Sequence, residues 1–131
     1  MSITVKGNST DKNYITNLEV RDLTFKVDEP IDKGGQNTAA TPMDLIGGAL
    51  SSCTIITLQM YFNHKKWKYN DIEVIVDFDE KKLPITFKRL IKINGEFEEK
   101  QKERILRIAN ACPVHKALEI GNHIITVVEI H

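Results

Sequence analysis

The most constraining feature of this sequence is an apolar stretch from Leu45 to Phe62, interrupted only by small, hydroxyl-bearing or amide side chains. Its start is well marked, because Thr41 can cap a helix, Pro42 fits the first turn, and Asp44 places an acid near the N-terminal amides. A helix that is apolar on most of its circumference has to be covered by other protein. We therefore expect a long central helix and, in a chain of only 131 residues, a partner subunit that covers part of it.

The composition excludes some classes of binding partner and indicates where in the cell the protein is located. The chain is 41% hydrophobic and 27% charged, as ordinary globular domains are, and it holds as many Lys and Arg as Asp and Glu. A balanced charge gives no positive field to attract nucleic acid or anionic lipid. Ser, Thr and Gln inside the long helix argue against a membrane span, and residues 1–7 do not read as a signal peptide. We expect a cytoplasmic protein that binds neither nucleic acid nor membrane.

Alternating apolar and polar residues predict strands before and after the helix. These strands are expected near residues 3–5, 18–20, 23–27, 72–78, 85–93 and 123–130. Turns are expected at 7–12, 21–22 and 81–84, a loop at 30–40, and two further helices at 96–111 and 113–118, the first with Phe97, Ile105, Leu106, Ile108 and Ala109 inward. The order predicts a single α+β domain, residues 1–131, with helices packed on antiparallel sheet.

The chain has two cysteines, and each allows more than one interpretation. Cys53 lies in the apolar helix, where a thiol can simply fill space. Cys112 precedes Pro113 at the expected cap of a new helix, where free amides and the helix dipole favour a thiolate, although it could merely occupy the cap. Structural zinc needs four ligands and only His115 stands near Cys112, so no metal is expected. The remaining interpretation is a pair of redox-active thiols, which needs a cation and an apolar pocket.

Two segments resemble the cysteine motifs of the OsmC/Ohr family, the osmotically inducible and organic hydroperoxide resistance proteins. The first runs from Thr41-Pro42-Met43-Asp44-Leu45-Ile46 to Ala49-Leu50-Ser51-Ser52-Cys53-Thr54, and the second is Arg107-Ile108-Ala109-Asn110-Ala111-Cys112-Pro113-Val114-His115-Lys116-Ala117-Leu118. Asp28-Glu29-Pro30, Gly34-Gly35 and the Asn94-Gly95 turn match as well, so the likeness covers nearly the whole chain in order.

The resemblance implies an OsmC-like fold, in which antiparallel sheets surround a long buried helix, and an intertwined homodimer with two active sites at the subunit interface. It also implies thiol peroxidation without a metal or organic cofactor. Cys53 would attack an organic hydroperoxide and become a sulfenic acid, and Cys112 would condense with it to a disulfide. An external dithiol would reduce that disulfide; dihydrolipoamide-type reductants serve some relatives.

The chain departs from the pattern of well-studied peroxidase relatives, which carry a Glu after the motif proline and an upstream Arg that bonds both this Glu and the reactive thiolate. Met43 stands at the Glu position, and Asp44 is either an auxiliary catalytic acid or only a helix N-terminal acid. Arg21 and Lys33 are the candidate cations, although both also fit solvated turn residues. Without a close cation, burial would slow peroxide attack by Cys53.

Two further side chains stand out. Arg89 occupies the apolar face of a predicted strand, where it would either reach the sheet edge or pair with a buried carboxylate, and we favour a structural role. His115 could tune Cys112, but an exposed helix histidine is the favoured interpretation.

The missing Glu leaves a second function open. The chain would then be a non-enzymatic relative that binds an apolar small molecule, or that senses oxidants through a reversible disulfide between Cys53 and Cys112.

Overall fold

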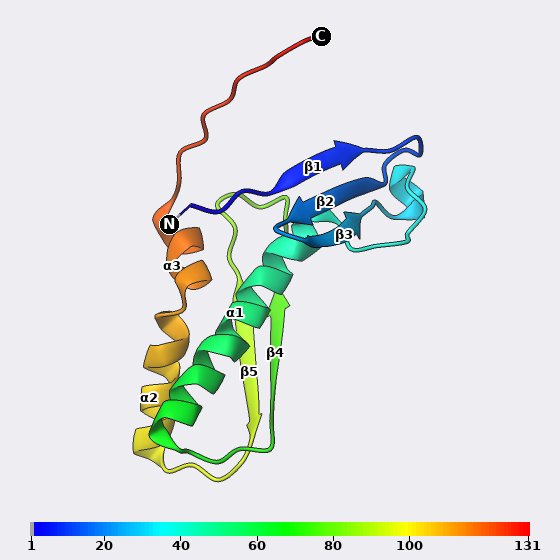
Figure 1. Ribbon diagram of the computed structural model, residues 1–131. Coiled ribbons are helices and arrows are strands. Elements are labelled where there is room, and N and C mark those ends of the chain that lie inside the picture. The colour runs from blue at the N-terminus through cyan, green and yellow to red at the C-terminus, as the bar shows by residue number, and fades with distance from the viewer. Residues whose placement is uncertain (1) are drawn as a thin grey trace. The chain divides into compact units, whose positions relative to one another are not determined.

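The computed structural model describes residues 2–131 and is an α+β protein with antiparallel sheets and one long helix, as predicted (Figure 1). The chain divides into two compact units, one ending at Gly47 and the other beginning at Gly48. The interpretation of residues 1–131 as one domain stays a prediction.

The first unit contains a three-stranded antiparallel sheet. Its strands are β1 (Lys6–Ser9), β2 (Thr16–Val20) and β3 (Leu23–Val27), in the order β1-β2-β3. The turn predicted at 21–22 is confirmed. The strand predicted around residues 3–5 is wrong, because β1 begins at Lys6 and runs into the segment predicted as a turn, where Gly7 pairs with Leu18 of β2. Pairing with β2, which local alternation does not reveal, sets the position of β1.

Asp28 organises the loop that follows β3. Its buried carboxylate accepts hydrogen bonds from the backbone N–H groups of Glu29, Gln36 and Thr38 at 2.8, 3.3 and 3.1 Å, and from the Thr38 hydroxyl at 2.8 Å. Burial alone would raise the pKa of Asp28, but these hydrogen bonds hold it below its usual 3.8. The loop also needs Gly35, because a Cβ there would lie 2.0 Å from the Glu29 carbonyl oxygen.

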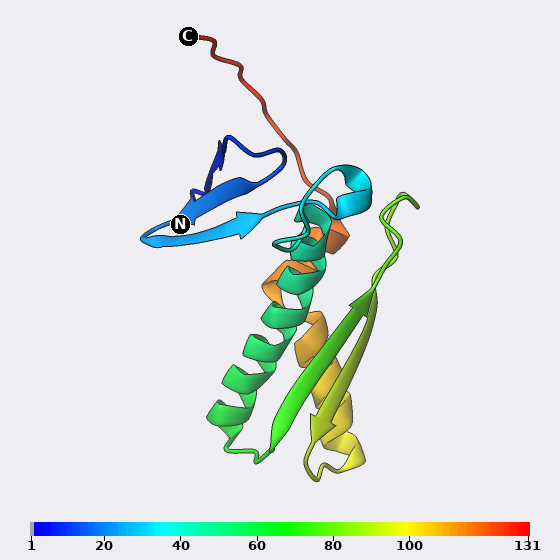
Figure 2. The ribbon, with the colours of Figure 1, turned by 90° about the vertical axis from the view of Figure 1, so that its right-hand side faces the viewer.

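The second unit combines a hairpin with helices. Its elements are the long helix α1 (Pro42–Lys65), which begins in the first unit, then β4 (Asp71–Asp77), β5 (Lys88–Asn94), α2 (Glu99–Asn110) and α3 (Pro113–Ile120). Strands β4 and β5 are antiparallel, and α1 and α2 run along one face of this hairpin (Figures 1 and 2). β5 is shorter than predicted, because its pairing with β4 begins at Lys88 and leaves Ile85 and Phe87 outside.

One face of α1 supplies most of the core. Leu50, Thr54, Leu58 and Phe62, spaced four residues apart, are buried. Leu58 and Phe62 pack with Ile105 of α2. The rings of Trp67, Tyr69 and Phe97 lie 5.9, 5.3 and 5.5 Å from that of Phe62.

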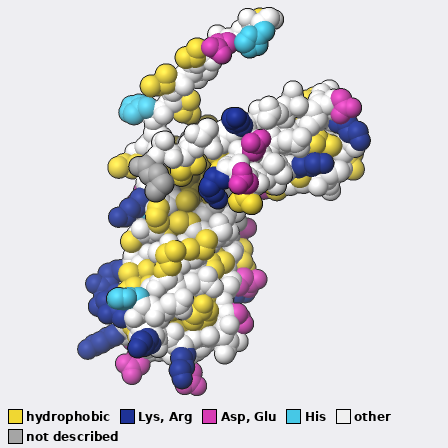
Figure 3. Space-filling view, in the orientation of Figure 1, with side chains coloured by type: hydrophobic (Ala, Val, Ile, Leu, Met, Phe, Trp, Pro, Cys, Tyr) yellow, Lys and Arg dark blue, Asp and Glu magenta, His cyan; other side chains and the backbone are white. Residues whose placement is uncertain are grey.

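The opposite face of α1 is uncovered in the single chain. Ile56 is 50% exposed and Met60 is 68% exposed, so the helix is buried on one side only (Figure 3). The full burial expected from the sequence therefore does not occur within one chain. Leu106 of α2, predicted to point inward, is 58% exposed because the hairpin and α1 cover only the Ile105 side of that helix.

The last predicted strand does not form. Residues 121–131 adopt no helix or strand, and the apolar side chains of this segment, including Ile125 and Val127, are exposed (Figures 1 and 3). A strand requires a hydrogen-bonded neighbour, and no strand of the described residues pairs with this segment. The alternating apolar and polar residues that predicted the strand are present, but the neighbouring strand that would pair with them is not among the described residues.

Helix α1 is the one helix of the described residues that is long and apolar enough to cross a membrane by length and composition. The core helix of a water-soluble protein meets the same criterion, so this property does not indicate a membrane protein.

Candidate redox site

The two cysteines, 59 residues apart by their numbers 53 and 112, come together in the second unit. Cys53 lies on α1 and is half-buried, whereas Cys112 is the N-cap residue of α3 and is completely buried. Both are free thiols, and the Cys53 side chain lies close enough to Cys112 to help lower the pKa of the Cys112 thiol. The predicted cap position of Cys112 is confirmed.

The surroundings of Cys112 favour its thiolate. Burial by itself raises the pKa of this thiol, but hydrogen bonds from the His115 N–H, the side chains of Cys53 and Thr54, and the Val114 N–H outweigh that effect and lower the pKa from its ordinary value of 9.0. The His115 N–H lies 3.3 Å from Cys112 Sγ. The helix cap thus presents amide hydrogens to the sulfur, as the sequence predicted.

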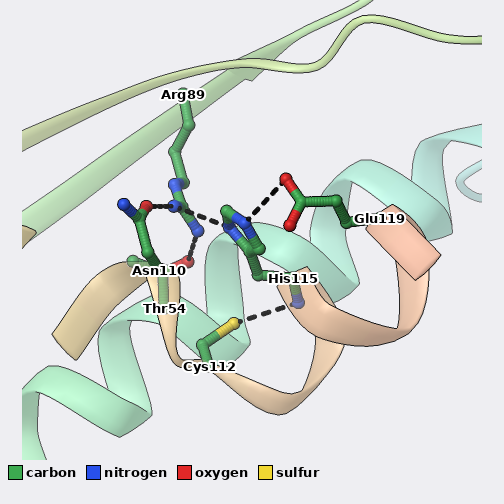
Figure 4. A network of polar contacts seen from close by, with 6 residues as sticks. All are labelled: Thr54, Arg89, Asn110, Cys112, His115 and Glu119. Atoms are coloured by element: carbon green, nitrogen blue, oxygen red, sulfur yellow. Dashed lines mark hydrogen bonds and ion pairs between the residues drawn. The ribbon is translucent and has the colours of Figure 1, made fainter. Parts of the chain in front are cut away.

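Arg89 on β5 is the centre of a polar network beside this thiol (Figure 4). Its Nη1 donates to Thr54 Oγ1 at 3.0 Å, and its Nη2 donates to Asn110 Oδ1 at 2.9 Å. The same Nη2 lies 3.0 Å from His115 Nδ1. Since a guanidinium can only donate, Nδ1 must accept and the proton of neutral His115 is on Nε2, which lies 3.4 Å from a Glu119 carboxylate oxygen.

The interpretation of His115 as an exposed helix residue is wrong, and Arg89 has other partners than the expected carboxylate, while its structural role stays a prediction. Arg89 is partly exposed and forms no ion pair with a carboxylate of residues 2–131; its partners are a hydroxyl, an amide and an imidazole. His115 is not exposed, because its side chain lies between Arg89 and Glu119 and is 21% accessible. Sequence reasoning also missed Thr54 and Asn110. The available signal was their position next to the cysteines, together with an arginine on an apolar strand face.

Asp44 forms a reciprocal cap with Thr41. The Thr41 N–H donates to Asp44 Oδ2 at 2.9 Å, and the Asp44 N–H donates to Thr41 Oγ1 at 3.0 Å. These bonds account for Asp44 as a helix N-terminal acid.

The other predicted auxiliary residues belong to the first unit. Arg21 is exposed in the β2–β3 turn, where its φ is 54°, and Lys33 is exposed at the end of the short 3-10 helix η1 (Ile31–Lys33). The activating roles of Arg21, Lys33 and Asp44 stay predictions.

Metal ligands do not gather at the site. Within residues 2–131, no group of three or more His, Cys, Asp or Glu side chains is placed to hold a metal ion. The chemistry that the site can perform with its own side chains is that of a half-exposed thiol beside a buried, thiolate-favouring thiol.

Comparison with protein families identifies the chain's family. The family described as OsmC-like protein matches residues 35–127, which is more than half of the chain. A comparison with curated protein sequences gave no significant match.

Solved structures share the fold at low sequence identity. An OsmC-like protein from Mycoplasma pneumoniae has a TM-score of 0.73 at 15% identity, covering 92% of this chain and 89% of its own. A Psychrobacter arcticus protein, described in terms of osmotic stress induction and detoxification response, has a TM-score of 0.73 at 20% identity over 88% and 86%. A Legionella pneumophila organic hydroperoxide resistance protein has a TM-score of 0.64 at 18% identity over 92% and 90%.

Proposed function

Because the chain belongs to the OsmC-like protein family, we propose that it reduces organic hydroperoxides with Cys53 and Cys112 as its redox pair. Family membership supports a role in hydroperoxide resistance. The observation that carries the proposal is the position of the partly accessible Cys53 thiol beside the buried Cys112 thiol, whose sulfur accepts from the His115 N–H at a helix N-cap. A disulfide between them forms when the thiolate of one attacks the oxidised sulfur of the other.

The proposed reaction begins at Cys53, the more accessible thiol. Its sulfur attacks the outer oxygen of the hydroperoxide, the O–O bond breaks, and the alcohol leaves with the proton of the thiol. Cys53 becomes a sulfenic acid. The Cys112 thiolate then attacks the oxidised sulfur and displaces hydroxide, which takes a proton to become water. One hydroperoxide and two thiols thus yield one alcohol, one water and one disulfide.

The side chains around Cys53 favour apolar peroxides and a dithiol reductant. Ile56, three residues after Cys53 on α1, is 50% exposed, so a peroxide with a hydrocarbon group has an apolar surface to contact. A dithiol, such as a reduced lipoyl group, would reduce the Cys53–Cys112 disulfide to two thiols. The dithiol itself would be oxidised to a disulfide. No metal or organic cofactor takes part in these steps.

We also propose a homodimer in the cytoplasm. The uncovered face of α1 around Ile56 and Met60, and the apolar C-terminal segment 123–130, both expose hydrophobic surface to water in the single chain. Surfaces of this kind mark protein interfaces. A second copy would provide a strand neighbour for the C-terminal segment and an apolar cover for the helix, which also accounts for its membrane-like composition without a membrane.

The test is reaction of the reduced protein with one equivalent of cumene hydroperoxide, followed by intact-mass and peptide analysis, and then turnover with dihydrolipoamide. We expect loss of two hydrogens, mapped to a bond between Cys53 and Cys112, and steady peroxide consumption. Cys53→Ser should abolish consumption. Cys112→Ser should still consume one equivalent and stop at a Cys53 sulfenic acid, trappable with dimedone. If both thiols of the wild-type protein stay reduced, the peroxidase proposal is wrong.

A second candidate function is binding of an apolar small molecule. In the second unit, a cavity of about 600 Å³ is lined by β5, α2 and the connection between them, including Ile91, Ile93, Phe97, Ile105 and Leu106. This volume is within the usual range of small-molecule sites. Saturable binding of a fluorescent fatty acid, without peroxide turnover, would favour this function over the first.

A further inference from the structure

Arg89 contacts both cysteine-bearing segments. Its guanidinium donates to Thr54, the residue after Cys53, and to Asn110, two residues before Cys112. It also lies against the side chain of His115, whose N–H donates to the Cys112 sulfur. A strand residue thus joins α1 to the α2–α3 junction beside the Cys112 thiol (Figure 4).

The Thr54 hydroxyl connects Arg89 to Cys112. It is completely buried, accepts from Arg89, and carries a single proton, which is directed to the Leu50 carbonyl at 2.7 Å. The Cys112 sulfur is a competing acceptor for that proton. When Cys112 is charged, the hydroxyl can turn toward the sulfur while still accepting from Arg89, so that the arginine's positive charge stands one hydroxyl away from the thiolate.

We propose that Arg89 is a positioning residue that stabilises Cys112 as the leaving thiolate, and thereby directs the recycling dithiol to attack the sulfur of Cys53. This inference rests on the proposed function for its disulfide and its reductant. It adds which sulfur is attacked, which one leaves, and which cation controls the choice.

The accessibility of the two sulfurs and their quality as leaving groups both favour attack of the reductant on the Cys53 sulfur. Cys112 is completely buried, whereas Cys53 is only half-buried. In thiol–disulfide exchange, the more acidic thiol is the better leaving group. An incoming thiolate therefore forms a bond to the Cys53 sulfur, the Cys53–Cys112 bond breaks, and its electron pair remains on Cys112. The second thiol of the reductant then displaces Cys53, and the reductant leaves as a disulfide.

The charged and titratable groups that face Cys112 come from three elements. Cys53 contributes from α1, Arg89 from β5 through Thr54, and His115 from α3, with Glu119 behind its imidazole. Arg89 is the permanent positive charge in this group, since arginine stays protonated at all working pH values.

The first test determines the attacked sulfur without any peroxide. The disulfide is made with diamide, mixed with the monothiol N-acetylcysteine, quenched in acid and alkylated, and the peptides are analysed by mass spectrometry. We expect the monothiol on Cys53 and the alkyl group on Cys112. An adduct mainly on Cys112 would overturn the proposal. Since diamide makes the disulfide, a protein that fails to reduce peroxides still gives a result here.

The second test measures the thiolate of Cys112 by its ultraviolet absorbance against pH, in a Cys53→Ser background. Arg89→Met should raise the titration midpoint by about one pH unit, a tenfold fall in the ratio of thiolate to thiol. Arg89→Lys, which restores a charge without the planar fork, should recover part of the shift. Arg104→Met is the matched control, because Arg104 donates to the Tyr61 hydroxyl, which is outside the Arg89 network, and should leave the midpoint unchanged.

Folding of the Arg89→Met variant is checked by circular dichroism. If it does not fold, Thr54→Val, which removes the connecting hydroxyl and keeps the shape, replaces it and should give the same upward shift. An unchanged midpoint in a folded Arg89→Met or Thr54→Val variant would refute the role of Arg89, even if peroxide reduction is intact.

Discussion

The Arg89 guanidinium lies 3.0 Å from the Thr54 hydroxyl, and Thr54 is wholly buried next to Cys53. This contact places a charged hydrogen bond between the hairpin and α1. The Thr54 hydroxyl accepts a hydrogen bond from Arg89 and donates one to the Leu50 carbonyl. Stability and thiol chemistry therefore depend on the same oxygen atom.

Replacement of Thr54 by Val should destabilise the protein by about 1–3 kcal/mol, because the partly buried Arg89 Nη1 and the Leu50 carbonyl both lose their hydrogen-bond partner. Thr54→Ser keeps the oxygen and should cost less than half of that. Urea denaturation of the two variants and the wild type provides the comparison. A larger loss for Ser than for Val would show that the Thr54 methyl group, and not its hydroxyl, supplies the stability.

The reduced protein should become more stable as the pH rises toward 9. The folded state holds the pKa of Cys112 below its ordinary 9.0, so between these two values the unfolded chain binds more protons than the folded one. The gain is complete above 9.0 and is lost as the pH falls through the folded value. Urea midpoints across this range should show the slope in the wild type and in Cys53→Ser. Cys112→Ser should lack it.

The proposed homodimer should dissociate when its apolar surfaces are charged or removed. Met60→Glu places a carboxylate on the uncovered face of α1, where a partner subunit would bury it, and we expect the dissociation constant to rise by at least about a hundredfold. Deletion of residues 123–131 should have the same direction of effect. Sedimentation velocity measures both, with Lys82→Glu in the exposed β4–β5 connection as the charge control. A wild-type protein that sediments as a monomer would contradict the proposal.

Asp28→Asn should destabilise the first unit. The carboxylate accepts three backbone N–H groups and one hydroxyl, and an amide nitrogen in its place would face donors instead of acceptors. The wild type should also lose stability as the pH falls below 3.8 through the lowered pKa of Asp28, and the variant should lose less. Thermal unfolding against pH tests both effects. Asp32→Asn, exposed in η1, is the matched control and should change little.

Features that depend on neighbouring residues were predicted from the sequence. The start of α1 at Pro42 and the N-cap position of Cys112 are examples, because caps form between residues three positions apart. The meeting of the two cysteines also agrees with the family resemblance, which carries long-range information that periodicity lacks.

Features that depend on distant residues were not predicted. Arg89 meets Thr54 and Asn110 across 35 and 21 residues of sequence, and an arginine on an apolar strand face does not identify its partners. The predicted strand at 123–130 failed for a related reason, since alternation shows which side chains share a face and a strand also needs a neighbour. The register of β1 depended in the same way on β2.

The complete burial of Cys112 has a consequence for the lifetime of the protein. Irreversible damage to a thiol requires repeated contact with oxidant, and the sulfinic and sulfonic acids formed have no simple route back. Cys53 receives these encounters while Cys112 is shielded. After many turnovers, the protein should therefore be inactivated by overoxidation of Cys53 alone. The Cys112 thiol at the N-cap of α3 should still be intact.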